Sequence, residues 1–213
     1  MIFVKFPEPG KVKTRLAKSV GDEAAADIYR KLVARVLERV VAAEPIEGND
    51  GQWKVWILFD PPEREGEIRA WLDPMLGRGF DGYFPQVEGD LGARLGAAFA
   101  RGFETGFGRI AAIGTDCIEF AEAEIRECWS LLEESDVVFG PAEDGGYYLI
   151  GMKREHPELF AEIPWSSRQT LEATLTAAAG AGLAVATLPT MSDVDEIEQW
   201  EALCASDPQS LNG

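Results

Sequence analysis

Short apolar runs alternate with longer stretches of helical periodicity along this chain of 213 residues. The clearest apolar runs are WKVWILFD at 53–60 and RIAAIG at 109–114, and the clearest helical stretch covers 22–43. Parallel strands joined by crossover helices produce this pattern, because each strand is buried and each returning helix has one apolar face. The alternation therefore predicts an α/β fold with a mainly parallel sheet, and the length suits one domain over 1–213.

The same pattern, with Pro and Gly as end markers, sets the expected elements. The expected strands are 2–6, 53–60, a short one within 79–86, 109–114, 136–139, 147–152 and 183–188. The expected helices are 22–43, 63–72, 90–105, 121–134, one after 167 and one from about 195. Asp90 has the residue type of an N-cap for the helix 90–105.

The composition limits the possible partners. The formal net charge of −17 argues against nucleic acid, which needs a basic face. No segment approaches the roughly 20 apolar residues that span a bilayer, so no membrane span is expected. Three cysteines without a CxxC pair suit a reducing cytoplasm. The single histidine, His156, argues against a histidine-based triad or a multi-histidine metal site, and we expect it to be a structural residue at the surface.

Positive charge is concentrated at the N-terminus despite the acidic total. Five of the twenty Lys and Arg residues lie in the first eighteen positions: Lys5, Lys11, Lys13, Arg15 and Lys18. They lie on a short strand, the Pro/Gly-rich loop 7–10 and the approach to a helix. Backbone N–H groups of the loop can point at phosphate oxygens while Lys13 and Arg15 neutralise the phosphate charge. The pattern indicates an anion-binding loop, and a solvated basic stretch is the alternative.

Asp116 follows directly after the buried run 109–114. Ligands of open α/β sheets bind at the carboxyl ends of strands, and a carboxylate there can hold a hard divalent cation against a diphosphate. The alternative is an aspartate that caps a helix or closes a turn.

The segment GPAEDGG at 140–146 places Glu143 and Asp144 before Gly145 and Gly146. The glycines let the backbone approach a ligand closely, with two acids beside it. The alternative is a tight hairpin turn, for which Asp-Gly is a common signal.

Two further candidates lie toward the C-terminus. Asp193 and Asp195 are two residues apart, so in an extended backbone they share a face, although one of them can serve as a helix cap. Trp165 can stack on a base or sugar, or pack in the core.

Two common nucleotide motifs are absent from the chain. Gly10 and Lys11 are followed by Val12 and lack the earlier glycine of the GxxxxGK[ST] loop, and no GxGxxG follows the first strand. These gaps argue against a P-loop kinase and a nicotinamide-dependent dehydrogenase.

Six motifs in order along the chain carry a family resemblance: KFPEPGKVKTRL at 5–16, GDLGARL at 89–95, IGTDC at 113–117, FGPAEDGGYYLIGM at 139–152, PWSS at 164–167 and DVD at 193–195. Together they resemble the bacterial glycosyltransferase-A-like transferases known as radical-SAM/selenodomain-associated transferase 1. That family is grouped with nucleotide-diphospho-sugar transferases and is similar in fold to the molybdenum cofactor and 2-phospholactate guanylyltransferases. One departure is Ile118, which stands where the family usually has proline.

The resemblance implies a three-layer α/β/α sandwich with a mainly parallel mixed sheet, and a metal-dependent nucleotide-diphospho-sugar transferase. The implied cofactor is Mg²⁺ or Mn²⁺, and the implied partners are a nucleotide or nucleotide-sugar and a small-molecule acceptor. A nucleotidyltransferase that joins a nucleotide to a small phosphorylated acceptor is one alternative, and a non-catalytic nucleotide-binding module is another.

The resemblance also implies a set of site residues. The nucleotide phosphates would contact Lys5, Pro7, Gly10, Lys13, Thr14 and Arg15. The catalytic residues would be Asp144, Lys13 and Arg15. The substrate would contact Asp90, Arg94, Glu143, Asp144, Gly145, Gly146 and Trp165. The metal ligands would be Asp116 and Asp195, with Asp193 as the alternative second carboxylate.

Overall fold

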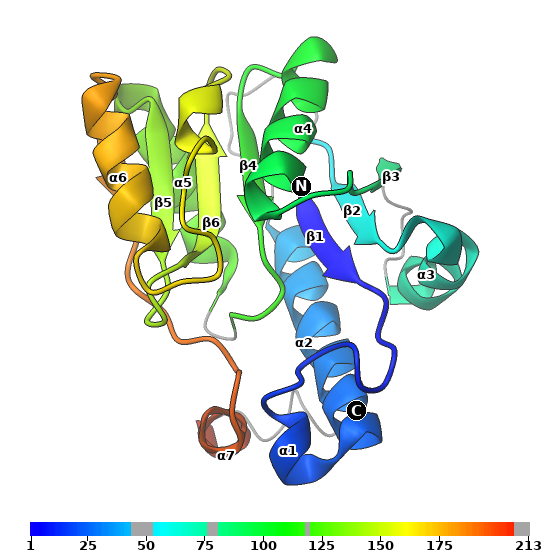
Figure 1. Ribbon diagram of the computed structural model, residues 1–213. Helices are drawn as coiled ribbons and strands as arrows, with labels where there is room; N and C mark the ends of the chain where they lie inside the picture. Colours follow the sequence, from blue (N-terminus) through cyan, green and yellow to red (C-terminus); the bar gives the residue numbers. More distant parts are fainter. Residues whose placement is uncertain (44–52, 76–80, 118–119, 207–213) are drawn as a thin grey trace.

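The computed structural model describes residues 1–43, 53–75, 81–117 and 120–206 (Figure 1). Its strands form one seven-stranded sheet in the order β3-β2-β1-β4-β6-β5-β7. Neighbouring strands run parallel except at β6, which is antiparallel to both β4 and β5. The predicted α/β fold with a mainly parallel mixed sheet is confirmed.

The strands are β1 (Ile2–Lys5), β2 (Trp56–Asp60), β3 (Gly82–Pro85), β4 (Ile110–Ile113), β5 (Val137–Pro141), β6 (Tyr147–Met152) and β7 (Val185–Thr187). The helices are α1 (Ala17–Val20), α2 (Asp22–Ala42), α3 (Glu65–Leu72), α4 (Leu91–Glu104), α5 (Glu122–Glu134), α6 (Thr170–Gly180) and α7 (Ile197–Ser206). Short 3₁₀ turns cover Pro62–Arg64, Asp73–Met75 and Pro157–Leu159.

Helices cover both faces of the sheet (Figure 1). On one face, α2, α3 and α5 pack in a core cluster that includes Val33, Ile68 and Ile125. On the other face, α4 and α6 pack in a cluster that includes Phe99 and Ala178. The sheet is therefore the middle of three layers, which explains why its central strands are almost continuously apolar.

A smaller cluster lies beyond the tip of β1, where Figure 1 shows α1 and α7 beside the first turns of α2. Leu16, Leu32, Val194 and Leu203 are buried together there. This packing brings the chain after residue 10 against the segment before α7. The two segments are about 180 residues apart in sequence, as the hydrogen bond between Arg15 and Asp195 shows.

Most expected elements are confirmed, with shorter ends. The second strand begins at Trp56 instead of 53, and the helix expected from 63 begins with a 3₁₀ turn before α3. Asp90 caps α4, since its Oδ1 accepts from the N–H of Ala93 at 2.9 Å. Ile118 and the start of the segment 79–86 lie outside the described residues.

His156 is not at the surface as expected. Its ring is buried, its Nδ1 lies 3.0 Å from a Glu158 carboxylate oxygen, and its Nε2 accepts from Arg154 at 3.3 Å. Proline follows it and opens the 3₁₀ turn Pro157–Leu159. His156 is therefore a buried residue with side-chain partners on both ring nitrogens.

Among the described residues, no helix has both the length and the apolar character needed to cross a bilayer.

Candidate functional site

Neighbouring parallel strands end at one cavity of about 730 Å³. β1 ends at Lys5, β2 ends at Asp60, and β4 leads into Asp116, and all three residues line the cavity. Lys5 and Asp60 are register partners in adjacent strands, so their side chains lie on the same side of the sheet. This edge is the ligand-binding edge of open α/β sheets.

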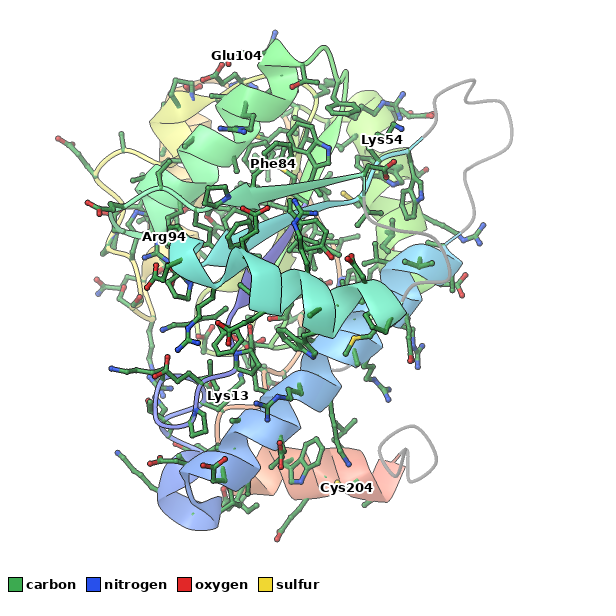
Figure 2. All side chains as sticks on the ribbon, turned by 90° about the vertical axis from the view of Figure 1, so that its right-hand side faces the viewer. Lys13, Lys54, Phe84, Arg94, Glu104 and Cys204 are labelled. Atoms are coloured by element: carbon green, nitrogen blue, oxygen red, sulfur yellow. The ribbon has the colours of Figure 1, made fainter. Side chains whose placement is uncertain are left out.

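Lys13, in the loop between β1 and α1 (Figure 2), is held between two aspartates of distant origin. Its Nζ lies 2.6 Å from an Asp116 oxygen and 3.4 Å from an Asp195 oxygen, and its side chain is only 4% exposed. The backbone of Lys13 is left-handed, with φ of 45°, a conformation that is uncommon for residues other than glycine. A buried ammonium requires such charge partners, because desolvation without them is costly.

Asp195 is the counter-ion of the basic loop, which is the segment 11–15 that carries Lys11, Lys13 and Arg15. Its other oxygen accepts from Arg15 at 3.0 Å, and its own N–H donates to the side chain of Gln199 at 2.9 Å. The preceding residue, Val194, donates its N–H to the carbonyl oxygen of Asp116 at 3.0 Å. These bonds fix the segment before α7 to both the loop and the end of β4.

Asp193 lies in the field of several carboxylates. Burial, and then the negative charges of Asp116 and Asp144, raise the pKa of Asp193 from 3.8 to about 7. Asp193 also bridges the backbone of Cys117, next to Asp116. The structure therefore brings the acids of three separate motifs toward one cavity, where negative charge accumulates.

Replacing Asp193 with asparagine is expected to stabilise the fold at high pH. The folded-state pKa lies above the unfolded one, so the stability from this group is complete below pH 4 and is lost as the pH rises through 7. Asparagine carries no charge at any of these pH values. The free energy of unfolding of the variant should therefore equal that of the wild type near pH 4 and exceed it by about 2 kcal/mol at pH 8. Urea unfolding of both proteins in EDTA measures this difference, and a pH-independent difference would contradict the assignment.

Tyr29 of α2 joins the two strand ends that carry Lys5 and Asp116. The N–H of Lys5 donates to the phenolic oxygen at 2.9 Å, and that oxygen lies 3.4 Å from the hydroxyl of Thr115. Burial, and then the nearby charge of Asp116, raise the pKa of Tyr29 well above its usual value. The phenol therefore stays protonated and can donate to Thr115 while accepting from Lys5.

Tyr29→Phe is expected to lower the free energy of unfolding by about 1–2 kcal/mol, because it leaves a buried N–H without its partner. It should also weaken severalfold the nucleotide binding that the motif resemblance implies, since the ends of β1 and β4 lose their common tie. Chemical denaturation measures the first effect and calorimetry measures the second.

Tyr83→Phe is the matched control for Tyr29→Phe, as it removes a phenol that donates to Asp73 at 2.6 Å on an edge strand. The control should lose stability and keep its nucleotide affinity. An equal loss of affinity in the two variants would contradict the role of Tyr29.

A second polar network lines the cavity at β2 and β3. The amide nitrogen of Gln86 donates to the carbonyl oxygen of Leu58 at 2.8 Å, and its amide oxygen accepts from Arg94 at 3.1 Å. Arg94 also lies 3.5 Å from a carboxylate oxygen of Asp60. These contacts hold the Asp60 carboxylate and the Arg94 guanidinium at the wall of the cavity.

The segment 142–146 is the turn of the β5–β6 hairpin, which was the alternative interpretation of its sequence. Asp144 accepts from the N–H of Gly146 at 2.8 Å, and Gly145 has φ of 90°. The turn is nevertheless part of the cavity wall, because both Asp144 and Gly146 line it. Trp165 lines it too, and packs against α4 at Gly92, where a Cβ would come within 2.4 Å of the indole nitrogen.

The predicted site residues divide into those that line a cavity and those that do not. The main cavity is lined by Lys5, Arg15, Arg94, Asp116, Asp144, Gly146 and Trp165. An adjoining cavity of about 260 Å³ is lined by Lys5, Lys13, Thr14, Arg15, Asp116 and Asp195. Pro7, Gly10, Asp90 and Glu143 line neither, and Gly145 lines a shallower depression of about 430 Å³.

Sequence reasoning did not single out Tyr29, Asp60 or Gln86, which all line the main cavity. Asp60 closes an apolar strand just as Asp116 does, so the same rule would have found it. Tyr29 and Gln86 lie within ordinary helical and loop patterns, and only their long-range hydrogen bonds distinguish them.

A separate cavity of about 340 Å³ lies at the opposite ends of the strands. Its walls include Trp53, Trp56, Phe107 and Trp129, and none of the described residues that line it is acidic. Its chemistry differs from that of the site at the carboxyl ends.

The donor set at the carboxyl ends fits a divalent cation that shares its coordination with a substrate. Asp116 is half-exposed to the cavity, and Asp193 lies beside it on the neighbouring backbone. Within the described ranges, no group of three or more His, Cys, Asp or Glu side chains is arranged to enclose an ion. A pair of carboxylates completed by phosphate and water oxygens is the arrangement that Mg²⁺ commonly adopts.

Comparisons with solved structures place this fold among nucleotide-handling proteins. A "putative nucleotide-diphospho-sugar transferase" from Desulfovibrio desulfuricans G20 is 31% identical, with a TM-score of 0.85 over 98% of this chain and 87% of that chain. The 4-diphosphocytidyl-2C-methyl-D-erythritol synthase from Anaerococcus prevotii DSM 20548 has a TM-score of 0.62 at 7% identity, over 98% and 95%.

Rv0371c from Mycobacterium tuberculosis H37Rv has a TM-score of 0.55 at 16% identity over 95% of each chain, and its manganese complex is also similar. At such identities the similarity of the synthase and of Rv0371c shows the fold alone.

No curated protein sequence matches this chain. The model of one family, described as "Uncharacterized protein conserved in bacteria (DUF2064)", matches residues 47–167. With more than half of its length matched, the chain belongs to the DUF2064 family.

Proposed function

We propose that this protein is a metal-dependent transferase that acts on a nucleotide-diphospho-sugar. The observation that carries the proposal is the convergence of a basic loop and a strand-end aspartate, since Lys13 and Asp116 meet at the carboxyl ends of parallel strands. The 31% identical neighbour from Desulfovibrio desulfuricans supports it, as does the motif resemblance to radical-SAM/selenodomain-associated transferase 1.

In this proposal Asp116 and Asp193 hold Mg²⁺ or Mn²⁺. The bound ion would supply charge neutralisation at the diphosphate. Asp193 replaces Asp195 in this role, because both oxygens of Asp195 are already paired, one with Lys13 and one with Arg15, whereas Lys13 pairs with only one oxygen of Asp116. Asp195 instead positions the basic loop.

The basic residues would serve the phosphates directly. Lys13 and Arg15 would offset the negative charge that develops on the leaving phosphate, through charge-assisted hydrogen bonds. Lys5, at the tip of β1, is exposed and would contact a further phosphate oxygen. When both the metal ion and the nucleotide are bound, the ammonium of Lys13 would exchange its contact with Asp116 for a contact with a phosphate oxygen.

Asp144 would orient the acceptor or take its proton. The residue sits on the hairpin turn before β6, and β6 lies two places along the sheet from β1, which carries Lys5, so Asp144 would meet the substrate from another side of the cavity. The bond between a phosphate oxygen and the transferred group breaks, and the acceptor oxygen forms the new bond.

A thermal-shift screen tests the proposal, with nucleotides and sugar nucleotides in Mg²⁺, in Mn²⁺ or in EDTA. A ligand that binds the folded state raises its melting temperature by mass action. A metal-dependent rise with a sugar nucleotide, followed by release of a nucleoside diphosphate, is the expected result. Release of pyrophosphate from a nucleoside triphosphate would instead identify a nucleotidyltransferase. Binding without turnover would identify a binding module, and no rise with any nucleotide would reject the proposal.

A further inference from the structure

Arg168 lines both the main cavity and the depression of about 430 Å³ beside it, and the proposed phosphate chemistry does not use this cation. It lies between the PWSS motif and α6, and it is exposed. Two other arginines of the main cavity are paired, Arg15 with Asp195 and Arg94 with Asp60. Arg168 makes no ion pair with any residue that the structure describes.

The backbone of Arg168 is fixed against the hairpin turn. At Gly145, a Cβ would lie 2.2 Å from the carbonyl oxygen of Arg168, so the absence of a side chain lets the two segments touch. The N–H of Leu171 donates to the carbonyl oxygen of Gly145 at 2.9 Å. Ser167 accepts from the N–H of Gln169 at 3.1 Å and closes the turn before α6. The position of Arg168 beside the hairpin turn is therefore built into the fold.

Arg168 is held by a different part of the sheet from Lys5. The hairpin that holds Arg168 belongs to β6 and β5, which lie two and three places from β1 in the sheet. Adjacent strands are about 4.8 Å apart, so these two strands lie roughly 10–15 Å from β1, which carries Lys5 and leads into the basic loop. One diphosphate on the basic loop would leave Arg168 available for a second group.

The charge of the surroundings indicates what this second group is. A neutral acceptor would need no cation, whereas an anionic one would be repelled by the four aspartates of the cavity and by the net charge of −17. The guanidinium is planar and binds carboxylate or phosphate through two parallel hydrogen bonds. Trp165, half-buried against Gly92, adds a flat apolar wall nearby.

We propose that Arg168 binds an anionic group of the acceptor, so that the second substrate is a small molecule with a carboxylate or a phosphate. This inference rests on the proposed function. It assigns the acceptor end of the cavity to the hairpin turn and the segment before α6, and the nucleotide end to the basic loop.

The test uses a protein that is saturated with a nucleoside diphosphate (ADP, CDP, GDP or UDP, whichever raises its melting temperature) in Mn²⁺. Glycerol 3-phosphate, glycerate and glycerol are then titrated by calorimetry. At least one of the two anions should bind and glycerol should not, and which anion binds distinguishes phosphate from carboxylate recognition.

Arg168→Gln should weaken that binding at least about tenfold and leave the nucleotide affinity within about twofold of the wild type. Arg168→Lys keeps the charge without the planar fork and should recover part of the affinity. The matched control is Arg126→Gln, which removes an equal charge from α5, where Arg126 pairs with Glu122.

The outcomes separate the two proposals. If no nucleoside diphosphate binds, the proposed function fails before the acceptor is tested. If the nucleotide binds, the inference about Arg168 is overturned by any of three results: no anion binding to the wild type, equal anion binding to Arg168→Gln, or competition between the anion and the nucleotide.

Discussion

Replacing Asp116 with asparagine is expected to weaken metal-dependent nucleotide binding at least about 100-fold, or about 2.7 kcal/mol. Asparagine keeps the shape and removes the charge that a hard divalent cation requires. The fold should melt close to the wild-type temperature, because the Asp116 side chain is half-exposed and Lys13 keeps Asp195 as a partner. Calorimetry with the nucleotide that the screen identifies, in Mn²⁺ and in EDTA, measures the effect.

Asp195→Asn is the informative control for that experiment. It removes the ion-pair partner of Arg15 and one partner of Lys13, and it leaves the carboxylate of Asp116 in place. We expect a smaller loss of nucleotide affinity, of about tenfold, and a preserved dependence on the metal. If Asp195→Asn abolished the metal dependence and Asp116→Asn did not, the ligand roles of the two residues would be reversed.

Gly145→Ala is expected to lower the free energy of unfolding by about 2–4 kcal/mol. Two costs add: a left-handed backbone that alanine disfavours by about 1–2 kcal/mol, and a Cβ placed 2.2 Å from the backbone oxygen of Arg168. Backbone atoms of a turn cannot move aside as a flexible side chain can. Urea unfolding monitored by tryptophan fluorescence measures the loss.

Gly106→Ala separates the two costs. Gly106 has φ of 95°, close to the 90° of Gly145, but no atom of the described residues lies within 4 Å of the position of its Cβ. Gly106→Ala should therefore lower the free energy of unfolding only by the cost of the left-handed backbone, about 1 kcal/mol. Equal losses at the two positions would show that the close approach of the hairpin to Arg168 contributes nothing to stability.

Local features of the chain were sufficient for much of the architecture. The apolar run that became β4 is too short and too continuous for a surface helix, and its burial follows from helices on both faces of the sheet. Asp90 was recognisable as a helix cap because capping depends only on the next three residues. Asp116 was identifiable as a strand-end residue for a similar local reason, although its role as a ligand stays a prediction.

The hairpin motif shows where local patterns stop. Asp144-Gly145-Gly146 fits a turn and a ligand loop equally well, because both need the same backbone freedom. Its place at the cavity depends on β6 running antiparallel between β4 and β5, which brings the turn to the same edge as the ends of β1 and β4. Strand order is a property of the whole sheet, so the motif itself cannot encode it.

The basic loop shows most clearly what the sequence determines and what the tertiary structure determines. Composition and spacing alone determined that Lys13 and Arg15 follow a strand, a place suited to an anion. Only the tertiary structure decided that Lys13 is buried between Asp116 and Asp195, and that Asp193 faces the cavity in the field of other acids. Local conformation depends on neighbouring residues, whereas these charge pairs depend on the packing of α1, α2 and α7, which joins segments from opposite ends of the chain.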